Sequence, residues 1–334
     1  MKVVVLHDQV PAGAPPDQAD SLIQATQVAG HLARLGHEAL PVSFAGRPQE
    51  TEERLRGLSP ELVFNLVESP LGQGRLIHLA PLLLERMGLR FTGAGTRAML
   101  LSSNKLMAKR LMQRHGLPTP PWLAAREAGE DFQAGRWIIK SVWEHASVGL
   151  DEDSVREYQA ARALRQEMER RQPSLGGDCF AERFIEGREF NLALLAYDRG
   201  VQVLPPAEII FEGYAAGKPK VVGYKAKWDE GSYEYHHTPR NYDFPPKDRL
   251  LLQELTALSL RAWRVFGLRG WARVDFRVDR RGGPWILEVN ANPCLAADAG
   301  FMAAADQAHL DAGQVVARIM ADASGPGGHG REAA

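Results

Sequence analysis

The sequence predicts an α/β protein of two or three domains. Three observations support this prediction. The chain has 334 residues, apolar strand patterns alternate with helical patterns over residues 1–101, and prolines cluster over 118–121, as is typical of a domain boundary. Because strand–helix alternation places helices on the faces of a parallel sheet, we expect such a sheet at the start of the chain.

The elements of residues 1–101 follow one another in a regular order. The run KVVVLHD is almost entirely apolar, as expected for a buried strand, and Gly36 stands where a left-handed C-cap would end the first helix. We expect strands over 2–8, 61–68 and 89–93, and helices from Asp17 or Asp20 to Leu35 and over 78–88.

The rest of the chain is richer in strand patterns. Helices are expected over 103–115, 152–171, 247–266 and 306–320, and strands over 136–140, 179–185, 189–197, 201–209, 221–228, 271–279 and 284–293. The helix over 152–171 is expected to turn inward Val155, Tyr158, Leu164 and Met168. Residues 321–334 offer little to bury, so we predict a disordered tail.

The composition excludes several classes of protein. Lys and Arg number 40 against 41 Asp and Glu, and this balance does not favour a non-specific binder of nucleic acid or of a membrane surface. No run approaches the ~18 apolar residues of a membrane span, and the first residues form a strand pattern rather than a signal sequence. Two cysteines cannot form a disulfide framework, so we expect a reducing compartment, the cytoplasm.

The most informative stretch is a predicted antiparallel hairpin formed by WARVDFRVD and PWILEVNAN. A turn centred on the DRRGGP link places Asp275 opposite Glu288, and Arg273 opposite Asn290, on one face of the sheet. Because side chains alternate with period two, the apolar face of the second strand is expected to carry Trp285, Leu287 and Val289.

Two carboxylates directly opposite each other on a sheet repel, and a cation between them relieves the repulsion. Together with an amide oxygen they form an all-oxygen ligand set that suits Mg²⁺. The alternative is a solvated face on which Arg273 and Arg277 form salt bridges with these acids. The hairpin alone leaves both interpretations open.

Seven motifs follow one another along the chain: SNKLMAKRLMQRHGLPTP, WIIKSVWEHASVGL, FAERFIEGREFNLALL, VLPPAEI, AKWDEGS, WARVDFRVD and LEVNANP. In their order and spacing they resemble the motifs of ATP-grasp ligases of the D-alanine–D-alanine ligase type. The resemblance extends from residue 1 to about residue 310. It implies three α/β domains, with ATP held between the central and the C-terminal one. We place the N-terminal domain, on the substrate side, at 1–101 and the central domain with the lid at 102–187. The C-terminal domain with the metal site spans 188–320, and the tail spans 321–334.

The resemblance assigns a nucleotide site residue by residue. Lys105, Lys140 and Lys227 match the lysines that contact the ATP phosphates, for which a compact point charge is well suited. Ser147, in the loop 144–149, matches the phosphate-covering lid. The linker that recognises adenine is matched by Glu182, Phe184 and Ile185, whose backbone would satisfy the base edge. Glu189 matches the acid that binds the ribose hydroxyls.

The metal ligands of the family are matched by Asp275, Glu288 and Asn290, so the hairpin and the resemblance agree. Arg273 matches the arginine that stabilises the oxyanion of a tetrahedral intermediate, acting with Ser147 and Lys227 on the transferring group. The implied cofactors are ATP and Mg²⁺, with Mn²⁺ as an alternative metal. The implied reaction joins a small carboxylate to an amine through an acyl phosphate and releases ADP and phosphate. A homodimer is also implied.

The sequence departs from true D-alanine–D-alanine ligases at both substrate subsites. The family's N-terminal Gly-Gly-x-Ser-x-Glu stretch is absent, and the other replaced positions are Glu68, Ser69, Ala146, Trp228, Cys294 and Asp298. Glu68 or Asp298 could hold an ammonium group, or both could be surface residues. We therefore expect a ligase acting on substrates other than two D-alanines. A true D-alanine–D-alanine ligase and a catalytically weak nucleotide-binding module remain alternatives.

Overall fold

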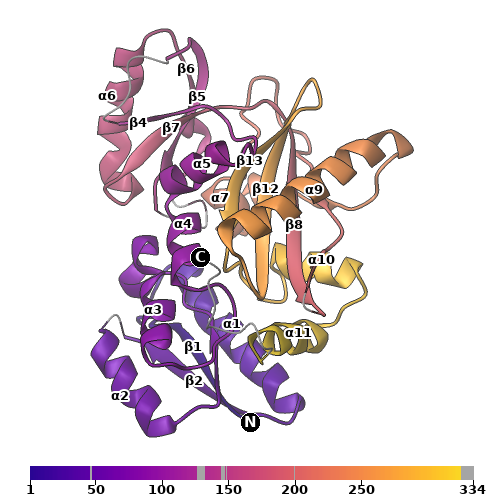
Figure 1. Ribbon diagram of the computed structural model, residues 1–334. Coiled ribbons are helices and arrows are strands. Elements are labelled where there is room, and N and C mark those ends of the chain that lie inside the picture. Colours follow the sequence, from indigo (N-terminus) through magenta and orange to yellow (C-terminus); the bar gives the residue numbers. More distant parts are fainter. Residues whose placement is uncertain (46, 126–131, 144–146, 148, 199, 325–334) are drawn as a thin grey trace.

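The computed structural model describes the chain except residues 46, 126–131, 144–146, 148, 199 and 325–334. Its strands form three sheets, which lie one after another along the sequence (Figure 1). This arrangement agrees with the predicted α/β class. In the described part of the chain, no helix is long and apolar enough to cross a membrane.

The first sheet is parallel, as predicted, and has the strand order β2-β1-β3. Helices α1, α2 and α3 (Pro16–Arg34, Pro48–Leu58 and Leu79–Arg86) accompany its strands β1, β2 and β3 (Lys2–Asp8, Glu38–Phe44 and Leu62–Asn65). The prediction missed β2 and α2. Strand β2 is an edge strand that contains Pro41 and exposes several side chains, so its apolar pattern is weak. The short strand expected over 89–93 is reduced to a single bridge between Val63 and Phe91.

The second sheet is antiparallel, with the strand order β4-β7-β5-β6. These strands span Trp122–Ala124 (β4), Gly135–Ser141 (β5), Val155–Tyr158 (β6) and Cys179–Arg183 (β7). The prediction of a helix over 152–171 was wrong for the first part of that range. A 3-10 turn and β6 occupy 152–158, and helix α6 spans only Ala161–Arg171, because Val155 and its neighbours pair with β5.

Two helices precede this sheet where one was predicted over 103–115. Helix α4 (Thr96–Ser103) ends and α5 (Lys105–Arg114) begins at Asn104, whose side chain accepts a hydrogen bond from the backbone N–H of Met107. The N-cap therefore divides the helical pattern and places Lys105 at the first position of α5.

The third sheet carries β11-β10-β8-β12-β13, with β9 paired to β8. Its strands span Gly187–Tyr197 (β8), Gly200–Val203 (β9), Ala207–Ile209 (β10), Arg240–Asn241 (β11), Trp271–Asp279 (β12) and Pro284–Asn290 (β13). The helices of this region are α7 (Tyr224–Trp228), α8 (Tyr233–His236), α9 (Arg249–Phe266), α10 (Gly300–Gln307) and α11 (Ala312–Ser324).

Four predictions in this region needed correction. The helix expected over 306–320 is interrupted, because α10 ends at Gln307, His309 has a left-handed backbone (φ 58°) and α11 begins at Ala312. The strand expected over 201–209 is divided into β9 and β10 around Pro205 and Pro206, which lack the N–H groups that a ladder needs. The strand expected over 221–228 is instead a loop followed by α7. Residues 321–324, predicted to be part of a disordered tail, continue helix α11, and the rest of that tail lies outside the described residues.

The β12–β13 hairpin has the predicted register at its functional end. Asp275 pairs with Glu288, and Arg273 pairs with Asn290. A β-bulge then shifts the register, because Phe276 pairs with Ile286 and leaves Leu287 as an extra residue.

The bulge changes which side chains of β13 are buried in the core. Ile286 and Val289 pack in the core cluster, whereas Leu287 lines a cavity and Trp285 is only half-buried. The predicted apolar face of Trp285, Leu287 and Val289 was therefore correct only for Val289.

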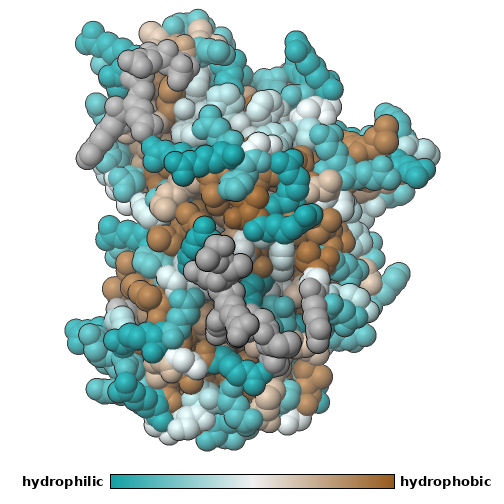
Figure 2. Space-filling model, viewed as in Figure 1, coloured by the Kyte–Doolittle hydropathy of each residue, from teal (hydrophilic) through white to brown (hydrophobic). Residues whose placement is uncertain are grey.

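One apolar cluster joins the first and third sheets. It contains Val3 and Val5 of β1, Leu195 of β8, Trp271 of β12 and Ile319 of α11. Figure 2 shows hydrophilic residues around the periphery of the molecule and apolar residues toward the middle of the visible face. The shared core holds the ends of the first and third sheets next to each other and thereby fixes the walls of the space between them.

Candidate active site

A cavity of about 580 Å³ is lined by residues of the second and third sheets, of helix α1 and of the loops and helices between them. It contains every site residue that the sequence predicted, namely Lys105, Lys140, Ser147, Glu182, Phe184, Ile185, Glu189, Lys227, Arg273, Asp275, Glu288 and Asn290. These residues lie up to 185 positions apart in the chain (105 to 290). The fold therefore brings the whole predicted set into one place.

The carboxylates of the hairpin are surrounded by positive charge. Arg273 contacts Asp275 through two hydrogen bonds, Nε to Oδ1 at 2.7 Å and Nη2 to Oδ2 at 2.8 Å. Asn191 Nδ2 also donates to Oδ1 of Asp275 at 2.9 Å, and Nζ of Lys105 lies 3.6 Å from Oε1 of Glu288. Burial opposes the charge of Arg273, but the neighbouring carboxylates raise its pKa above the ordinary value.

The hairpin fits a divalent cation through oxygen ligands alone. Asp275 and Glu288 stand opposite each other, and the side-chain oxygen of Asn290 accepts only the nearby N–H of Asn292 among the hydrogen bonds described. In the described part of the chain, no three His, Cys, Asp or Glu side chains are grouped to hold a metal ion. A metal here therefore depends on the amide oxygen and on non-protein oxygens, which suits Mg²⁺.

The three lysines approach the cavity from different elements. Lys227 lies in α7, and burial, with the nearby Arg273, lowers its pKa. Lys140 is the next-to-last residue of β5, and its Nζ lies 2.6 Å from Oε1 of Glu182. Lys105 and Lys227 thus lie near the acids of the hairpin, whereas Lys140 lies at Glu182.

Glu182 has a role that its place in the predicted adenine linker did not suggest. Its side chain is 1% exposed and also pairs with Nζ of Lys109 at 2.5 Å, so two ammonium groups flank one carboxylate. Burial by itself would raise the pKa of Glu182, but these two lysines hold it below the ordinary value. The side chain therefore ties α5 to β5 and β7.

The linker contacts are also more specific than expected. The backbone N–H of Phe184 donates to the carbonyl of Arg136 at 3.0 Å, so this N–H is already used within the protein. The guanidinium groups of Arg136 and Arg277 lie 5.1 and 5.4 Å from the centre of the Phe184 ring. Glu182 lies within β7 and is paired with strands on both sides, so the base edge would depend on other backbone groups of the linker, such as those of Ile185.

The described end of the predicted lid is held on both sides. Ser147 donates from Oγ to the carbonyl of Val222 at 2.8 Å, and the N–H of Tyr224 donates to the carbonyl of Leu150 at 3.0 Å. Residues 144–146 and 148, including the replaced position Ala146, lie outside the described residues.

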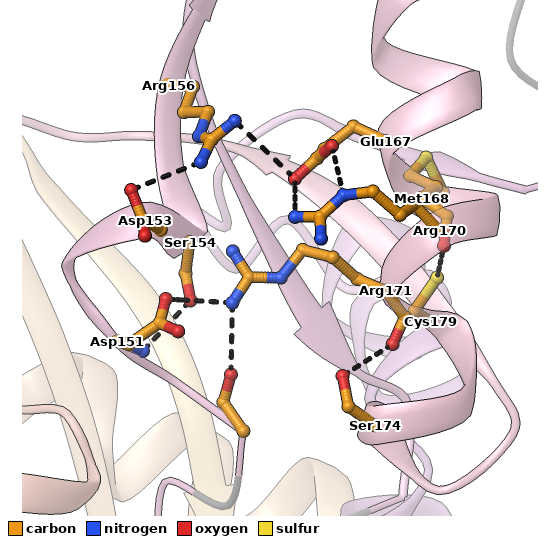
Figure 3. A network of polar contacts seen from close by, with 11 residues as sticks. Asp151, Asp153, Ser154, Arg156, Glu167, Met168, Arg170, Arg171, Ser174 and Cys179 are labelled. Atoms are coloured by element: carbon orange, nitrogen blue, oxygen red, sulfur yellow. Dashed lines mark hydrogen bonds and ion pairs between the residues drawn. The ribbon is translucent and has the colours of Figure 1, made fainter.

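A polar network then fixes the chain that follows the lid (Figure 3). Arg171 of α6 binds Oδ1 of Asp151 at 2.7 Å and the carbonyl of Gly149 at 3.5 Å. Asp151 and Ser154 also form a reciprocal capping box. Arg171 is buried, so it anchors this end of the lid to the second sheet and its helix.

The end of the cavity next to α1 is acidic. Asp17, Asp20, Glu68 and Asp298 all line it, and the thiol of Cys294 donates to Oδ2 of Asp20 at 2.9 Å. None of these acids except Glu68 and Asp298 was predicted, since α1 and the loops after β3 and β13 meet only in the folded chain.

Burial dominates the protonation of this acidic end. It raises the pKa of Glu68 to about 8, with Asp8 and Asp20 acting in the same direction and Gln24 and Arg273 opposing it. It also raises the pKa of Asp8 to about 6, although Asp8 accepts hydrogen bonds from the N–H groups of Glu68 and Ser69.

We expect Glu68→Gln to weaken the pH dependence of stability. The folded state binds the Glu68 proton more tightly than the unfolded chain, so wild-type stability falls as the pH rises from about 4.5 through about 8. Each pKa unit corresponds to about 1.4 kcal/mol. Urea unfolding at pH 5 and pH 8.5 should show a smaller loss for the variant. Equal losses in both proteins would contradict the raised pKa, because Asp8, Asp20 and Arg273 are common to both.

Two site residues were missed although the sequence holds a signal for them. Asn191 lies two positions after Glu189 on β8, and Arg277 lies two positions after Asp275 on β12. Period-two alternation places each on the same side of its strand as a predicted site residue. Both line the cavity.

Two solved structures have a similar fold. D-alanine–D-alanine ligase of Bacillus anthracis, solved in complex with ATP, superposes with a TM-score of 0.74 over 97% of both chains at 17% identity. D-alanyl-alanine synthetase A of Vibrio cholerae superposes with a TM-score of 0.71 at 16% identity, over 97% of this chain and 98% of the other. The fold is therefore that of the ATP-grasp proteins.

Sequence comparison then identifies the family. Residues 111–321 match the family described as D-ala D-ala ligase C-terminus, and the chain belongs to this family of ATP-grasp carboxylate–amine ligases. The D-alanine–D-alanine ligase of Moorella thermoacetica is 29% identical over 96% of this chain and 98% of its own length. That of Chromohalobacter salexigens is 30% identical over 97% and 95%, respectively.

Proposed function

We propose that this ligase uses ATP and Mg²⁺ to join a carboxylate substrate to an amine substrate, and that these two substrates are not both D-alanine. The observation that carries this proposal is one cavity, in which the predicted nucleotide and metal residues, with their lysines and Arg273 (the basic end), lie together with Asp17, Asp20, Glu68 and Asp298 (the acidic end). The basic end has the charge that a triphosphate requires. The acidic end differs from the family pattern at Glu68, Cys294 and Asp298.

In the proposed reaction, a substrate carboxylate oxygen attacks the γ-phosphorus of ATP, and ADP leaves. The amine then attacks the acyl carbon, phosphate leaves and the amine nitrogen loses a proton, so an amide bond forms. A divalent cation held by Asp275, Glu288 and Asn290 would neutralise charge on the phosphates. Lys105, Lys140 and Lys227 would hold the phosphate oxygens.

Arg273 is oriented for the second step before any substrate binds. Its two hydrogen bonds to Asp275 fix the plane of the guanidinium, and the group is largely buried. A donor fixed in this way stabilises charge that develops on an acyl oxygen without reorganising during the reaction. Ser147 lines the same cavity, and from the lid it would contact the transferring phosphoryl group.

We propose that the acidic end binds a substrate ammonium group through Asp298, Asp20 or Glu68. Asp20 is already engaged by the thiol of Cys294, and Glu68 accepts a hydrogen bond from Gln24 at 3.1 Å. A buried carboxyl with a raised pKa gains a cationic partner more readily than an anionic one, since that partner offsets the cost of ionising it. The acids at this end therefore favour a cationic group, whereas the guanidinium of Arg240, which also lines the cavity, would suit a carboxylate.

A substrate panel tests this proposal. ADP release is measured with ATP, Mg²⁺ and pairs of amino acids, dipeptides and amines, for the wild type and for Asp298→Asn. We expect the best pair to include a substrate with a second amino group, and we expect Asp298→Asn to raise the KM of that substrate about tenfold. D-Alanine with D-alanine as the best pair would refute the altered specificity.

The names of the relatives favour a second candidate, a true D-alanine–D-alanine ligase, and the same panel distinguishes it. ATP binding without ADP release for any pair would instead indicate a nucleotide-binding module.

We also propose a homodimer, on the basis of the family resemblance, and light scattering measures its mass directly.

A further inference from the structure

Arg277 lies in the nucleotide end of the cavity and has no role in the functional assignment given so far. It belongs to β12, two residues beyond Asp275, and its cross-strand neighbour on β8 is Glu189. The residue is 3% exposed, yet it lines the cavity. A buried cation at this place needs an explanation, because an unpaired charge in a protein interior is strongly destabilising.

The contacts of Arg277 account for its burial. Its Nη2 lies 2.8 Å from Oε2 of Glu189 and also donates to the carbonyl of Lys220. Its Nη1 donates to the carbonyl of Gly187 at 3.3 Å. These partners belong to β8 and to the loop before α7, so a single guanidinium joins two segments that face the nucleotide end.

Two aromatic rings complete its surroundings. The guanidinium carbon lies 5.4 Å from the centre of the Phe184 ring and 5.6 Å from that of Phe211. Guanidinium groups stack on aromatic rings and on other planar π systems. Phe184 belongs to the linker expected beside the base, so the planar face of Arg277 borders the same region.

The ion pair restricts Glu189. Glu189 is 9% exposed, so without Arg277 its carboxylate would be a buried anion that lacks its guanidinium partner. With Arg277, one carboxylate oxygen is held by a charge-assisted hydrogen bond, which fixes the side-chain direction. A carboxylate held in this way can accept hydrogen bonds from two adjacent hydroxyls without losing rotamer freedom on binding.

We propose that Arg277 is a positioning residue that holds Glu189 for the ribose hydroxyls of the nucleotide and thereby makes the site selective for a ribonucleotide. This inference rests on the proposed function, since it takes Glu189 as the ribose acceptor. It adds a residue that determines which nucleotides bind, in addition to the residues that bind the phosphates.

The test compares two nucleotides that differ by one hydroxyl. Calorimetric titration with ATP and with 2′-deoxy-ATP, in the presence of Mg²⁺, gives the ratio of their Kd values. The proteins are the wild type, Arg277→Met, Arg277→Lys, Glu189→Gln and the double variant Arg277→Met/Glu189→Gln. Arg280→Met is the matched control, because Arg280 lies three residues further along, is 82% exposed and pairs only with Glu186 among the described contacts.

We expect the wild type and the control to bind ATP about tenfold more tightly than 2′-deoxy-ATP. Arg277→Met should reduce this ratio toward one by weakening ATP binding, with little further change in the double variant. Arg277→Lys should keep an intermediate ratio, since it retains the charge without the planar fork. A purely structural role would instead weaken both nucleotides equally and leave the ratio unchanged.

The outcomes separate this inference from the function on which it rests. A wild type that does not bind ATP would overturn the proposed function. A wild type that prefers ATP, together with an Arg277→Met variant that keeps this preference, would overturn only the role of Arg277. A wild type that binds both nucleotides equally would remove Glu189 as the ribose acceptor and the inference with it. Melting temperatures of all variants identify any that fail to fold.

Discussion

Glu288→Gln is expected to lower the rate of ADP release by roughly 10²–10³-fold, the usual effect of removing one preorganised electrostatic group from an active site. The substitution keeps the shape of the side chain and removes the negative charge that would bind Mg²⁺. Glu288 pairs with Asp275 across the hairpin, so the remaining set holds one carboxylate instead of two. Turnover is measured with the best substrate pair from the panel.

Binding measurements distinguish a lost metal ligand from a general defect. In the wild type, Mg²⁺ should tighten ATP binding, and in Glu288→Gln this dependence should largely disappear. Asp275→Asn should behave similarly but also weakens the partner of the buried Arg273, which makes Glu288→Gln the cleaner variant. Glu254→Gln, on the exposed face of α9, is the control. Full activity of Glu288→Gln would contradict the assignment of Glu288 as a metal ligand.

Glu182→Gln is expected to lower the free energy of unfolding by about 3–5 kcal/mol, the usual cost of removing one partner of a buried ion pair. Both Glu182 and Lys109 are 1% exposed, and Lys140 is 13% exposed, so the variant leaves two ammonium groups without a carboxylate. Denaturant unfolding at pH 7 measures the change.

Two further variants test this explanation. Glu186→Gln removes a carboxylate that forms ion pairs at the surface, and it should cost less than about 1 kcal/mol. Lys109→Met/Glu182→Met replaces the buried pair by apolar groups and should recover much of the loss, although Lys140 remains. Equal effects of Glu182→Gln and Glu186→Gln would show that the buried pair does not stabilise the fold.

Much of the site could be predicted because its signals are local. The pairing of Asp275 with Glu288 follows from the alternation of two adjacent strands and the short turn between them, and the structure shows this register. The motifs place the lysines and the remaining predicted residues in one order along the chain, and all of them line one cavity. Ion pairs across the site, such as Glu182 with Lys109, could not be predicted, since no motif records them.

Errors arose where tertiary pairing overrides the local pattern. Residues 155–158 have a helical spacing, but they form β6 because β5 offers a partner for their backbone groups. The bulge at Leu287 reverses the expected faces of β13 beyond Glu288, because one extra residue shifts a period of two. Neither effect is encoded in the spacing of apolar residues.

Composition, strand alternation and the resemblance in motif order were sufficient to predict an α/β ligase of the ATP-grasp class, since these features depend on neighbours in the chain. The acidic end depends on the fold. Asp17, Glu68 and Asp298 come from three separate segments, and their proximity and the raised pKa of Glu68 result from burial where those segments meet. The choice of substrate is expected to depend on the place where these segments meet, because the interaction energy between two charges is much larger in a desolvated cavity than in water.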